Sequence, residues 1–201
     1  MQSPETTVDF TGQVLIAMPG MGDPRFDRSV VYMCSHSDKG AMGLIVNKPN
    51  RGLRFGDLLE QMSIETSDKT PDMPVYFGGP VEHGRGFVLH SRDYISDIST
   101  LEVSPAFAMT ATQDILEDIA VGNGPASAMM VLGYAGWGPG QLEQEISQNG
   151  WLTGEASHAL IFENPADEIW PDSLRRMGVD ALALSATAGP VSYTHLRAHE
   201  T

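Results

Sequence analysis

Glycine and proline divide this chain into short apolar segments. Its 201 residues include 21 glycines and 13 prolines, which are spread along the sequence instead of gathering in one linker. Because these residue types punctuate helices and strands, their spacing predicts many short elements. The sequence contains no internal repeat and no low-complexity segment. At about 100–200 residues per domain, the length predicts one domain, or at most two small ones.

The first half of the chain is rich in predicted strands. Lys39-Gly40 lies between two of them and favours a hairpin. Apolar residues at helical spacing predict a short amphipathic helix over 53–62, and the polar residues 63–73 predict a surface loop. Short apolar or β-rich runs predict strands at 13–18, 29–35, 42–46, 75–77 and 85–90.

The second half alternates predicted helices with predicted strands, after an ambiguous stretch at 91–105. Thr110 and Gln113 have the N-cap and N3 spacing of a capping box, which predicts a helix behind them. Pro139 suits the first position of another helix, which Gly150 ends. Further patterns predict a strand at 106–109, a central strand buried on both faces at 126–132, a strand at 159–162 and a helix over 167–177.

This mixture of elements predicts the fold class. Strands and helices alternate, yet the first third and the middle are rich in strands, which is typical of an α+β (mixed α/β) domain with a partly antiparallel sheet. The domain is expected over 10–189, after a flexible N-terminus at 1–9. Residues 190–201 differ in composition, with two histidines and one arginine after a run of small residues. We expect a non-native tail there and leave it out of the fold.

Charge and hydropathy exclude several classes of protein. The sequence has 26 acidic and 12 basic residues, and its net charge of −14 repels phosphate backbones. Direct binding of duplex DNA is therefore not expected without a local basic patch. No apolar run reaches the about 18–20 residues of a membrane helix. The polar start lacks the Lys or Arg of a signal peptide, so we expect a cytoplasmic protein without a membrane contact.

No catalytic or metal-binding motif is complete in this sequence. Gly78-Gly79-Pro80 lacks the lysine and the hydroxyl residue of a P-loop. The lone Cys34 excludes an internal disulfide. Its place after an apolar run predicts a buried, slowly reactive thiol without a catalytic or metal role. The histidines lack metal-ligand spacing, and we expect neither a metal nor a cofactor.

A set of polar, aromatic and glycine residues at predicted turns and strand ends forms the candidate binding site. Binding groups usually gather at such positions. The Gly136–Gly140 turn leads into a predicted helix N-terminus, where free N–H groups can hold an anion. The alternative is structural: Asn and Gln cap turns, and Trp fills the core. The candidate residues are Asn47, Arg85, His90, Gly136, Trp137, Gly138 and Gln141.

We expect four of these side chains to converge on one face, above the Gly136–Gly140 turn. Arg85 and His90 are five residues apart and take opposite sides of an ideal strand. A bulge at Gly86 would place both side chains on one face. Without a bulge, we expect Arg85, and not His90, to face the site. Trp137 is flanked by glycines and is expected to project outward as an anchor. Together with Gln141, these residues suit an anionic or carboxylate-bearing partner.

Five segments of the chain, taken in order, carry the features of one protein family. They are Leu15–Pro19 with Asp23-Pro24, Gly40–Pro49, Gly78–Val81 with Arg85–His90, Gly133–Trp137 with Gly140–Glu143 and Asn149–Trp151, and Trp170 with Gly178–Asp180. Over about residues 10–189 they resemble the AlgH/YqgE family of bacterial proteins. The resemblance implies a single domain with a strongly bent, partly barrel-like mixed sheet and flanking helices. It also implies a bacterial cytosolic protein.

Two function classes follow from these observations. The first is a non-enzymatic cytosolic binding or regulatory module, which would affect transcription indirectly through a protein partner or bind a small anionic ligand. Members of the family are sometimes labelled transcriptional regulators, a label that assigns no role to any residue here. The second is a small hydrolase or anion-binding transferase that uses His90, Arg85 and the Gly136–Gly140 turn. A deep pocket with a carboxylate within hydrogen-bond distance of His90 would favour the enzyme.

Overall fold

Ten strands within residues 8–187, the part of the chain that the computed structural model describes, form one sheet. Their hydrogen-bonded order is β10-β1-β2-β3-β9-β6-β8-β7, and β5 joins β4 to β9. The strands are β1 (Gln13–Ala17), β2 (Val30–Ser37), β3 (Gly40–Ile45), β4 (Pro49–Arg54), β5 (Pro74–Phe77), β6 (Val81–His90), β7 (Leu101–Glu102), β8 (Ala108–Thr110), β9 (Ala128–Trp137) and β10 (Trp151–Glu155). The α-helices are α1 (Phe55–Gln61), α2 (Gln113–Ala120), α3 (Gln141–Ser147), α4 (Ala166–Arg176) and α5 (Ala181–Thr187).

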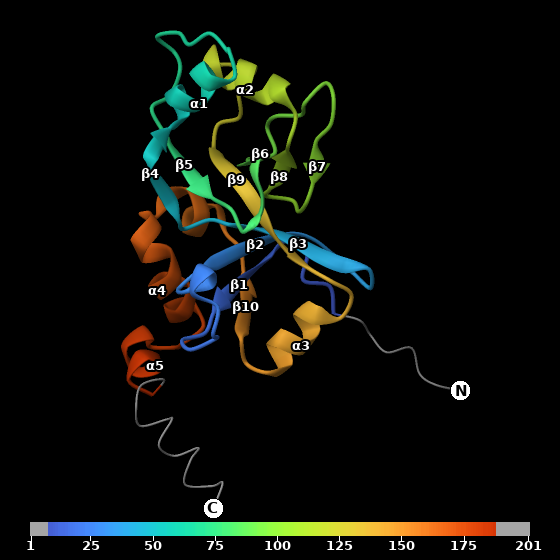
Figure 1. Ribbon diagram of the computed structural model, residues 1–201, viewed down its shortest axis with the longest axis vertical. Helices are drawn as coiled ribbons and strands as arrows, with labels where there is room; N and C mark the ends of the chain where they lie inside the picture. The colour runs from blue at the N-terminus through green and yellow to red at the C-terminus, as the bar shows by residue number, and fades with distance from the viewer. Residues whose placement is uncertain (1–7, 188–201) are drawn as a thin grey trace, which may run out of the picture.

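The sheet is curled into a half-barrel, with helices packed against it (Figure 1). Neighbouring strands run antiparallel, except that β5 runs parallel to β9. This architecture confirms the predicted α+β domain and its strongly bent, partly antiparallel sheet. The predicted tail at 190–201 and most of the predicted flexible start lie outside the described residues.

The long strand β9 holds the two halves of the sheet together. Its first half lies between β5 and β6, and its second half pairs with β3. Met130 and Val131 are buried, as expected for a strand that is covered on both faces. The predicted central strand at 126–132 is therefore confirmed, and it continues to Trp137.

The β2–β3 hairpin forms where Lys39-Gly40 predicts it. Ser37 pairs with Gly40 across the turn, and Gly40 has a φ of 137°, a backbone conformation that favours glycine. Met42 of β3 then pairs with Gly136 of β9. The tip of the hairpin is consequently placed beside the last residues of the central strand.

Helices cover the sheet with their apolar sides. α1 and α2 bury Leu58 and Ile115 in one hydrophobic cluster with Val88 and Met130 of the sheet. α4 buries Trp170 in a second cluster with β1 and β2, and α3 covers a third. In Figure 1, α1 and α2 lie together at the top, α4 and α5 at the left, and α3 at the bottom. The helices predicted over 53–62 and 167–177 are confirmed as α1 and α4.

The apolar segment 159–162 is not a strand, so that prediction is wrong. Ala159–Glu163 form a single turn of π-helix, in which the neighbours Leu160 and Ile161 are both buried. A run of four apolar residues does not distinguish a strand from a buried helical turn. The strand at this edge of the sheet is β10, whose mixed sequence shows no apolar alternation.

Two predicted helix starts are also wrong. Thr110 lies in β8, and the residue that precedes α2 as its N-cap is Thr112. Pro139 does not open α3, because Gly140 adopts a left-handed conformation with φ of 74° and the helix begins at Gln141. Each helix begins two residues later than predicted. The backbone conformation at the preceding turn sets where a helix begins, and the spacing of side chains does not reveal that conformation.

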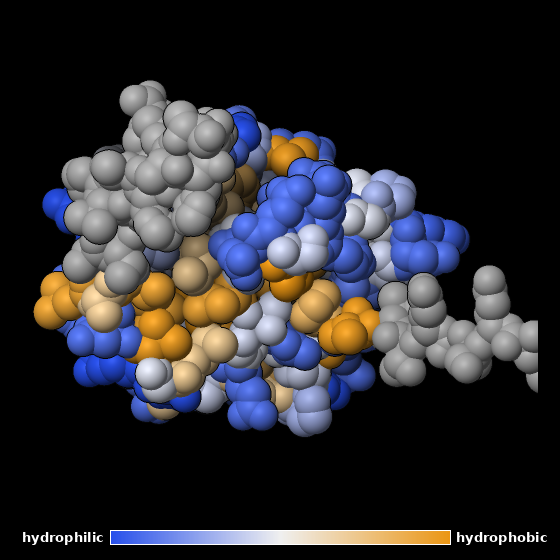
Figure 2. All heavy atoms as spheres, turned by 90° about the horizontal axis from the view of Figure 1, so that it is seen from below, coloured by the Kyte–Doolittle hydropathy of each residue, from blue (hydrophilic) through white to orange (hydrophobic). Residues whose placement is uncertain are grey.

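The surface of the described residues mixes polar and apolar groups. Figure 2 shows orange apolar groups beside blue polar groups on the face seen from below. Within residues 8–187, no helix combines the length and the apolar character needed to cross a membrane.

Candidate functional site

An open hollow of about 730 Å³ lies between the β2–β3 hairpin and strands β6, β8 and β9. We call it the hairpin groove. Its lining comes from segments far apart in sequence, because the pairing of β3 and β6 with β9 brings them to one place. The lining residues are Ser35, Ser37, Lys39, Gly40, Ala41, Met42, Val81, Arg85, Phe87, Leu101, Met109, Tyr134, Gly136 and Trp137.

The floor of the hairpin groove is apolar and aromatic. Phe87 and Tyr134 meet edge to face, with ring centroids 5.8 Å apart. The guanidinium carbon of Arg85 lies 5.2 Å from the centroid of the Phe87 ring, which is within cation–π range. This contact holds the arginine side chain against the floor while leaving it exposed to solvent.

The rim of the hairpin groove is positive on a strongly acidic protein. Among the residues that line it, all within the described part of the chain, the charged ones are Lys39 and Arg85. Glu82 lies outside the lining, 3.4 Å from Nη1 of Arg85, and both side chains are about half exposed. Such exposed pairs are worth at most about 1 kcal/mol. Desolvation, followed by the hydrogen bond to Glu82, raises the pKa of Tyr134, which therefore remains a neutral phenol.

Strand β6 is irregular just before Gly86. Its register against β9 shifts between Val81 and Gly86, and Glu82 has a positive φ of 47°. The irregularity does not bring Arg85 and His90 to one face. Arg85 faces the hairpin groove with Phe87, whereas His90 is buried on the other side of the strand.

His90 is enclosed in a network of neutral groups. Its side chain is 0% exposed, Nδ1 lies 2.8 Å from the carbonyl oxygen of Ser91, and Nε2 lies 2.8 Å from the hydroxyl of Thr110. A carbonyl can only accept, so Nδ1 donates to it and Nε2 accepts from Thr110. Burial lowers the pKa of His90. Its hydrogen-bond partners include no carboxylate within the described residues, and the imidazole has no access to the hairpin groove.

Trp137 lies at the groove but points into the core. Its side chain is 6% exposed, and its indole meets that of Trp151 edge to face with centroids 6.0 Å apart. The prediction that the indole projects outward is therefore wrong. The flanking glycines permit that conformation, but burial of a large aromatic surface against a second tryptophan outweighs it.

The remaining candidates have structural partners away from the groove. Oε1 of Gln141 accepts the backbone N–H of Gly138 at 3.0 Å, so the side chain of α3 itself occupies the turn that was expected to hold an anion. Oδ1 of Asn47 accepts the N–H of Val30, and its Nδ2 donates to the carbonyl of Arg28. Of the candidate set, the structure thus brings together Arg85, Gly136 and Trp137.

Several groove residues carry no signal of a site in the sequence. Lys39 indicates only a turn, and Tyr134 belongs only to a family-like segment. Met42 belongs to an apolar run and to a family-like segment, and Met109 belongs to an apolar run, but neither pattern indicates a site. Nothing in local spacing unites them, because they meet through the order of strands in the sheet. The alternation of side chains along β6 was the one available signal, since it places Arg85 beside Phe87.

Cys34 is buried, as predicted. Desolvation raises the pKa of its thiol to about 12, so the reactive thiolate is scarce at neutral pH. Among residues 8–187, no group of three or more His, Cys, Asp or Glu side chains is placed to hold a metal ion.

The fold and the groove define a class of small α+β protein, in which a half-barrel sheet presents an open hollow with a positive rim. The model of the AlgH-like family matches residues 14–182, and the chain belongs to that family. A UPF0301 protein from Ruegeria pomeroyi is 58% identical over 183 residues, covering 90% of this chain and 99% of the relative. A UPF0301 protein from Agrobacterium fabrum is 50% identical over 187 residues, covering 90% and 92%.

Two solved structures have the same fold. The solution structure of the AlgH protein from Pseudomonas aeruginosa superposes with a TM-score of 0.75 at 42% identity, and the match covers 94% of this chain and 98% of that one. A crystal structure of a protein from Corynebacterium diphtheriae gives a TM-score of 0.67 at 22% identity, covering 94% and 95%. These comparisons establish the family and the fold.

Proposed function

We propose that this protein is a non-enzymatic, cytosolic binding module whose hairpin groove takes an acidic peptide segment of a protein partner. The observation that carries the proposal is the pair of cations, Lys39 and Arg85, above an apolar floor. The chain as a whole is acidic, but both charged residues that line the groove are cations. The groove surface is therefore suited to carboxylates. The apolar floor suits aromatic or aliphatic side chains between those carboxylates.

The groove is open, which favours a peptide over a reaction centre. Catalysis needs a positioned nucleophile or base, and the buried His90 does not reach the groove. Any effect on transcription would pass through the bound partner, because the net charge of −14 opposes direct contact with DNA.

Isothermal titration with three matched peptides tests the proposal. The peptides share alternating leucine and phenylalanine residues, and the positions between them hold glutamate, glutamine or lysine. We expect the glutamate peptide to bind at least tenfold more tightly than the glutamine peptide, and the lysine peptide not to bind. Raising the salt concentration should weaken binding of the glutamate peptide, since the cations are exposed.

The variant Arg85→Gln should weaken binding of the glutamate peptide about tenfold, which corresponds to about 1.4 kcal/mol. Arg51→Gln is the matched control, because Arg51 is an exposed arginine on β4 that does not line the groove. Equal affinity for the glutamate and glutamine peptides, or an unchanged affinity in Arg85→Gln, would refute this function.

A further inference from the structure

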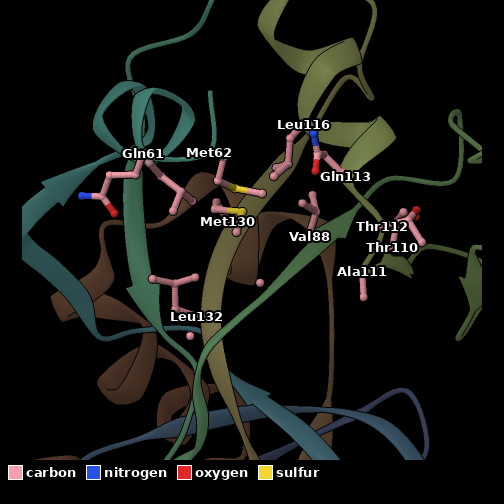
Figure 3. Close-up of a pocket in the computed structure, with 13 residues that line it drawn as sticks. Gln61, Met62, Val88, Thr110, Ala111, Thr112, Gln113, Leu116, Met130 and Leu132 are labelled. Carbon is pink, nitrogen blue, oxygen red and sulfur yellow. The ribbon is translucent and has the colours of Figure 1, made fainter. Parts of the chain in front are cut away.

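A second cavity, of about 390 Å³, lies between α1 and α2 over strands β6 and β9. We call it the interhelix pocket. Figure 3 shows Met62 reaching it from the end of α1, Leu116 and Gln113 from α2, and Val88, Met130 and Leu132 from the sheet, whereas the amide of Gln61 points away from them. The lining residues are Leu58, Gln61, Met62, Gly84, Gly86, Val88, Thr110, Ala111, Thr112, Gln113, Leu116, Met130 and Leu132.

The interhelix pocket is separate from the hairpin groove. Along β6, Gly84, Gly86 and Val88 line the pocket, whereas Arg85 and Phe87 line the groove. This is the alternation expected of a strand, so the sheet stands between the two hollows. A ligand in the pocket therefore touches none of the cations on which the proposed peptide binding depends.

The lining of the interhelix pocket is electrically neutral. Its residues, all within the described part of the chain, are apolar side chains, glycines, threonines and glutamines. A charged ligand would lose its hydration there without gaining a counter-charge. Nearby, the Thr112 hydroxyl donates to the carboxylate of Asp114 at 2.5 Å, which adds a negative charge behind the wall and disfavours anions further.

The walls of the pocket suit an apolar ligand with a polar group. Met62 and Met130 present flexible, polarisable thioethers, which adapt to ligands of different shape. The Thr110 and Thr112 hydroxyls donate to His90 and Asp114, and Nε2 of Gln113 donates to Glu117. The polar part of the lining therefore offers acceptor oxygens, which suit a ligand with an N–H or O–H group. Apolar walls with a few polar groups are typical of small-molecule sites, and a volume of 390 Å³ lies within their usual range of about 300–1,000 Å³.

Two glycines of β6 keep the pocket open. At Gly86, an added Cβ would come within 2.7 Å of the Met130 side chain, so a larger residue would push into the wall. At Gly84, an added Cβ would meet nothing within 4 Å, and φ lies outside the left-handed region. A side chain at Gly84 would therefore enter free space without straining the backbone.

We propose that the interhelix pocket is a binding site for an uncharged, mainly apolar small molecule that carries a hydrogen-bonding group. The neutral, partly enclosed lining selects against charged compounds. The site is independent of the hairpin groove in its residues and in the chemistry of what it binds.

Two dyes that differ in charge test this selectivity on the full chain. Phenylnaphthylamine is neutral and has one N–H, and anilinonaphthalene sulfonate has the same ring system with a sulfonate. Both fluoresce more strongly in apolar sites. We expect saturable binding of phenylnaphthylamine at one site, at least tenfold tighter than binding of the sulfonate. Absence of saturation, or equal binding of both dyes, would overturn the proposal.

A filled pocket provides the second arm of the experiment. Gly84→Leu should weaken binding of phenylnaphthylamine at least tenfold. Gly56→Leu is the matched control and should bind like the unaltered protein, because a Cβ at Gly56 also meets nothing within 4 Å and Gly56 does not line the pocket. Unchanged dye affinity in Gly84→Leu would refute the assignment of the site.

Amide chemical shifts of the unaltered protein locate the dye without any substitution. Phenylnaphthylamine should shift the amides of Gly84, Gly86 and Thr112 and leave that of Lys39 unchanged. If Gly84→Leu folds poorly, these amide shifts of the unaltered protein decide where the dye binds. Shifts confined to the hairpin groove would refute the assignment of the dye to the interhelix pocket. Failure of the glutamate peptide to bind would contradict only the proposed function, since the two sites share no residue.

Discussion

Nε2 of His36 lies 2.5 Å from Oε1 of Glu143, and this contact joins β2 to α3 across 107 positions of the sequence. Nδ1 of His36 accepts the backbone N–H of Phe10 at 3.1 Å, so the ring proton lies on Nε2 and is donated to the carboxylate. The His36 side chain is 2% exposed, and that of Glu143 is 40% exposed. Three segments are thus joined through one imidazole.

Replacing Glu143 with alanine should lower the free energy of unfolding by about 1 kcal/mol, because the buried imidazole N–H loses its acceptor. This cost is at the low end of the about 1–3 kcal/mol for an unpaired buried donor, because the Glu143 carboxylate is partly exposed. Gln144→Ala, on the exposed side of the same helix, should change stability by less than about 0.5 kcal/mol. Urea denaturation of both variants measures the difference, and equal effects would contradict a specific role of the pair.

The same pair predicts a dependence of stability on pH. The Glu143 backbone amide, followed by the hydrogen bond from His36, lowers the pKa of the Glu143 carboxyl below its ordinary value of 4.5. A lowered folded-state pKa contributes stability above the unfolded pKa, and that contribution is lost as pH falls through the folded value. The stability difference between the unaltered protein and Glu143→Gln should therefore shrink in acid. A difference that persists or grows there would contradict this assignment.

The Cys34 thiol should react slowly in the native protein. It is buried, and desolvation raises its pKa to about 12. A thiol reagent at neutral pH should label the folded chain at least a hundredfold more slowly than free cysteine, and denaturant should restore the rate. Cys34→Ala should leave binding of both the glutamate peptide and the dye unchanged. Labelling at the rate of free cysteine would show that the thiol is accessible.

Gly78 should tolerate no side chain. A Cβ there would lie 2.2 Å from the Val131 side chain and 2.3 Å from the carbonyl oxygen of Gly133. We expect Gly78→Ala to cost about 3 kcal/mol of unfolding free energy or more, because backbone must move. Gly84→Ala, on the next strand along the chain, is the control and should change stability by less than about 1 kcal/mol. Similar thermal midpoints for the two variants would contradict the close approach of the strands.

The isolated protein should not bind duplex DNA selectively. Lys48, Arg51 and Arg54 lie close together in the sequence, but Arg54 pairs with Asp72 at 2.7 Å and Lys48 donates to the carbonyl of Asp27. Non-specific binding even by basic proteins is only about 10⁻⁴–10⁻⁶ M at physiological salt. A mobility-shift titration should give no sequence-selective complex. Submicromolar, selective binding would overturn the prediction.

Elements whose signal is local were predictable from the sequence. The β2–β3 hairpin needs only two apolar runs and the Lys39-Gly40 turn, and the central strand needs one long apolar run. The π-helical turn Ala159–Glu163 and the strand β10 were not predictable, because their apolar residues have no period that separates strand from helix. Their conformation depends on what packs against them.

The candidate site was predictable only in part. Arg85 could be found because alternation along a strand sets which side it faces. Trp137 could not be oriented, since its direction depends on Trp151, which β10 brings close. Lys39 joins Arg85 at the groove through the order of strands, a property of the whole sheet that no short pattern contains.

Strand β9 has a consequence for how the molecule denatures. It contributes Met129 to one hydrophobic cluster, Met130 to the second and Ala135 to the third. Because one strand belongs to all three clusters and pairs with β3, β5 and β6, we expect the three clusters to melt together. The described chain should therefore unfold as one cooperative unit, and the amide hydrogens of β9 should exchange with solvent only through that global opening.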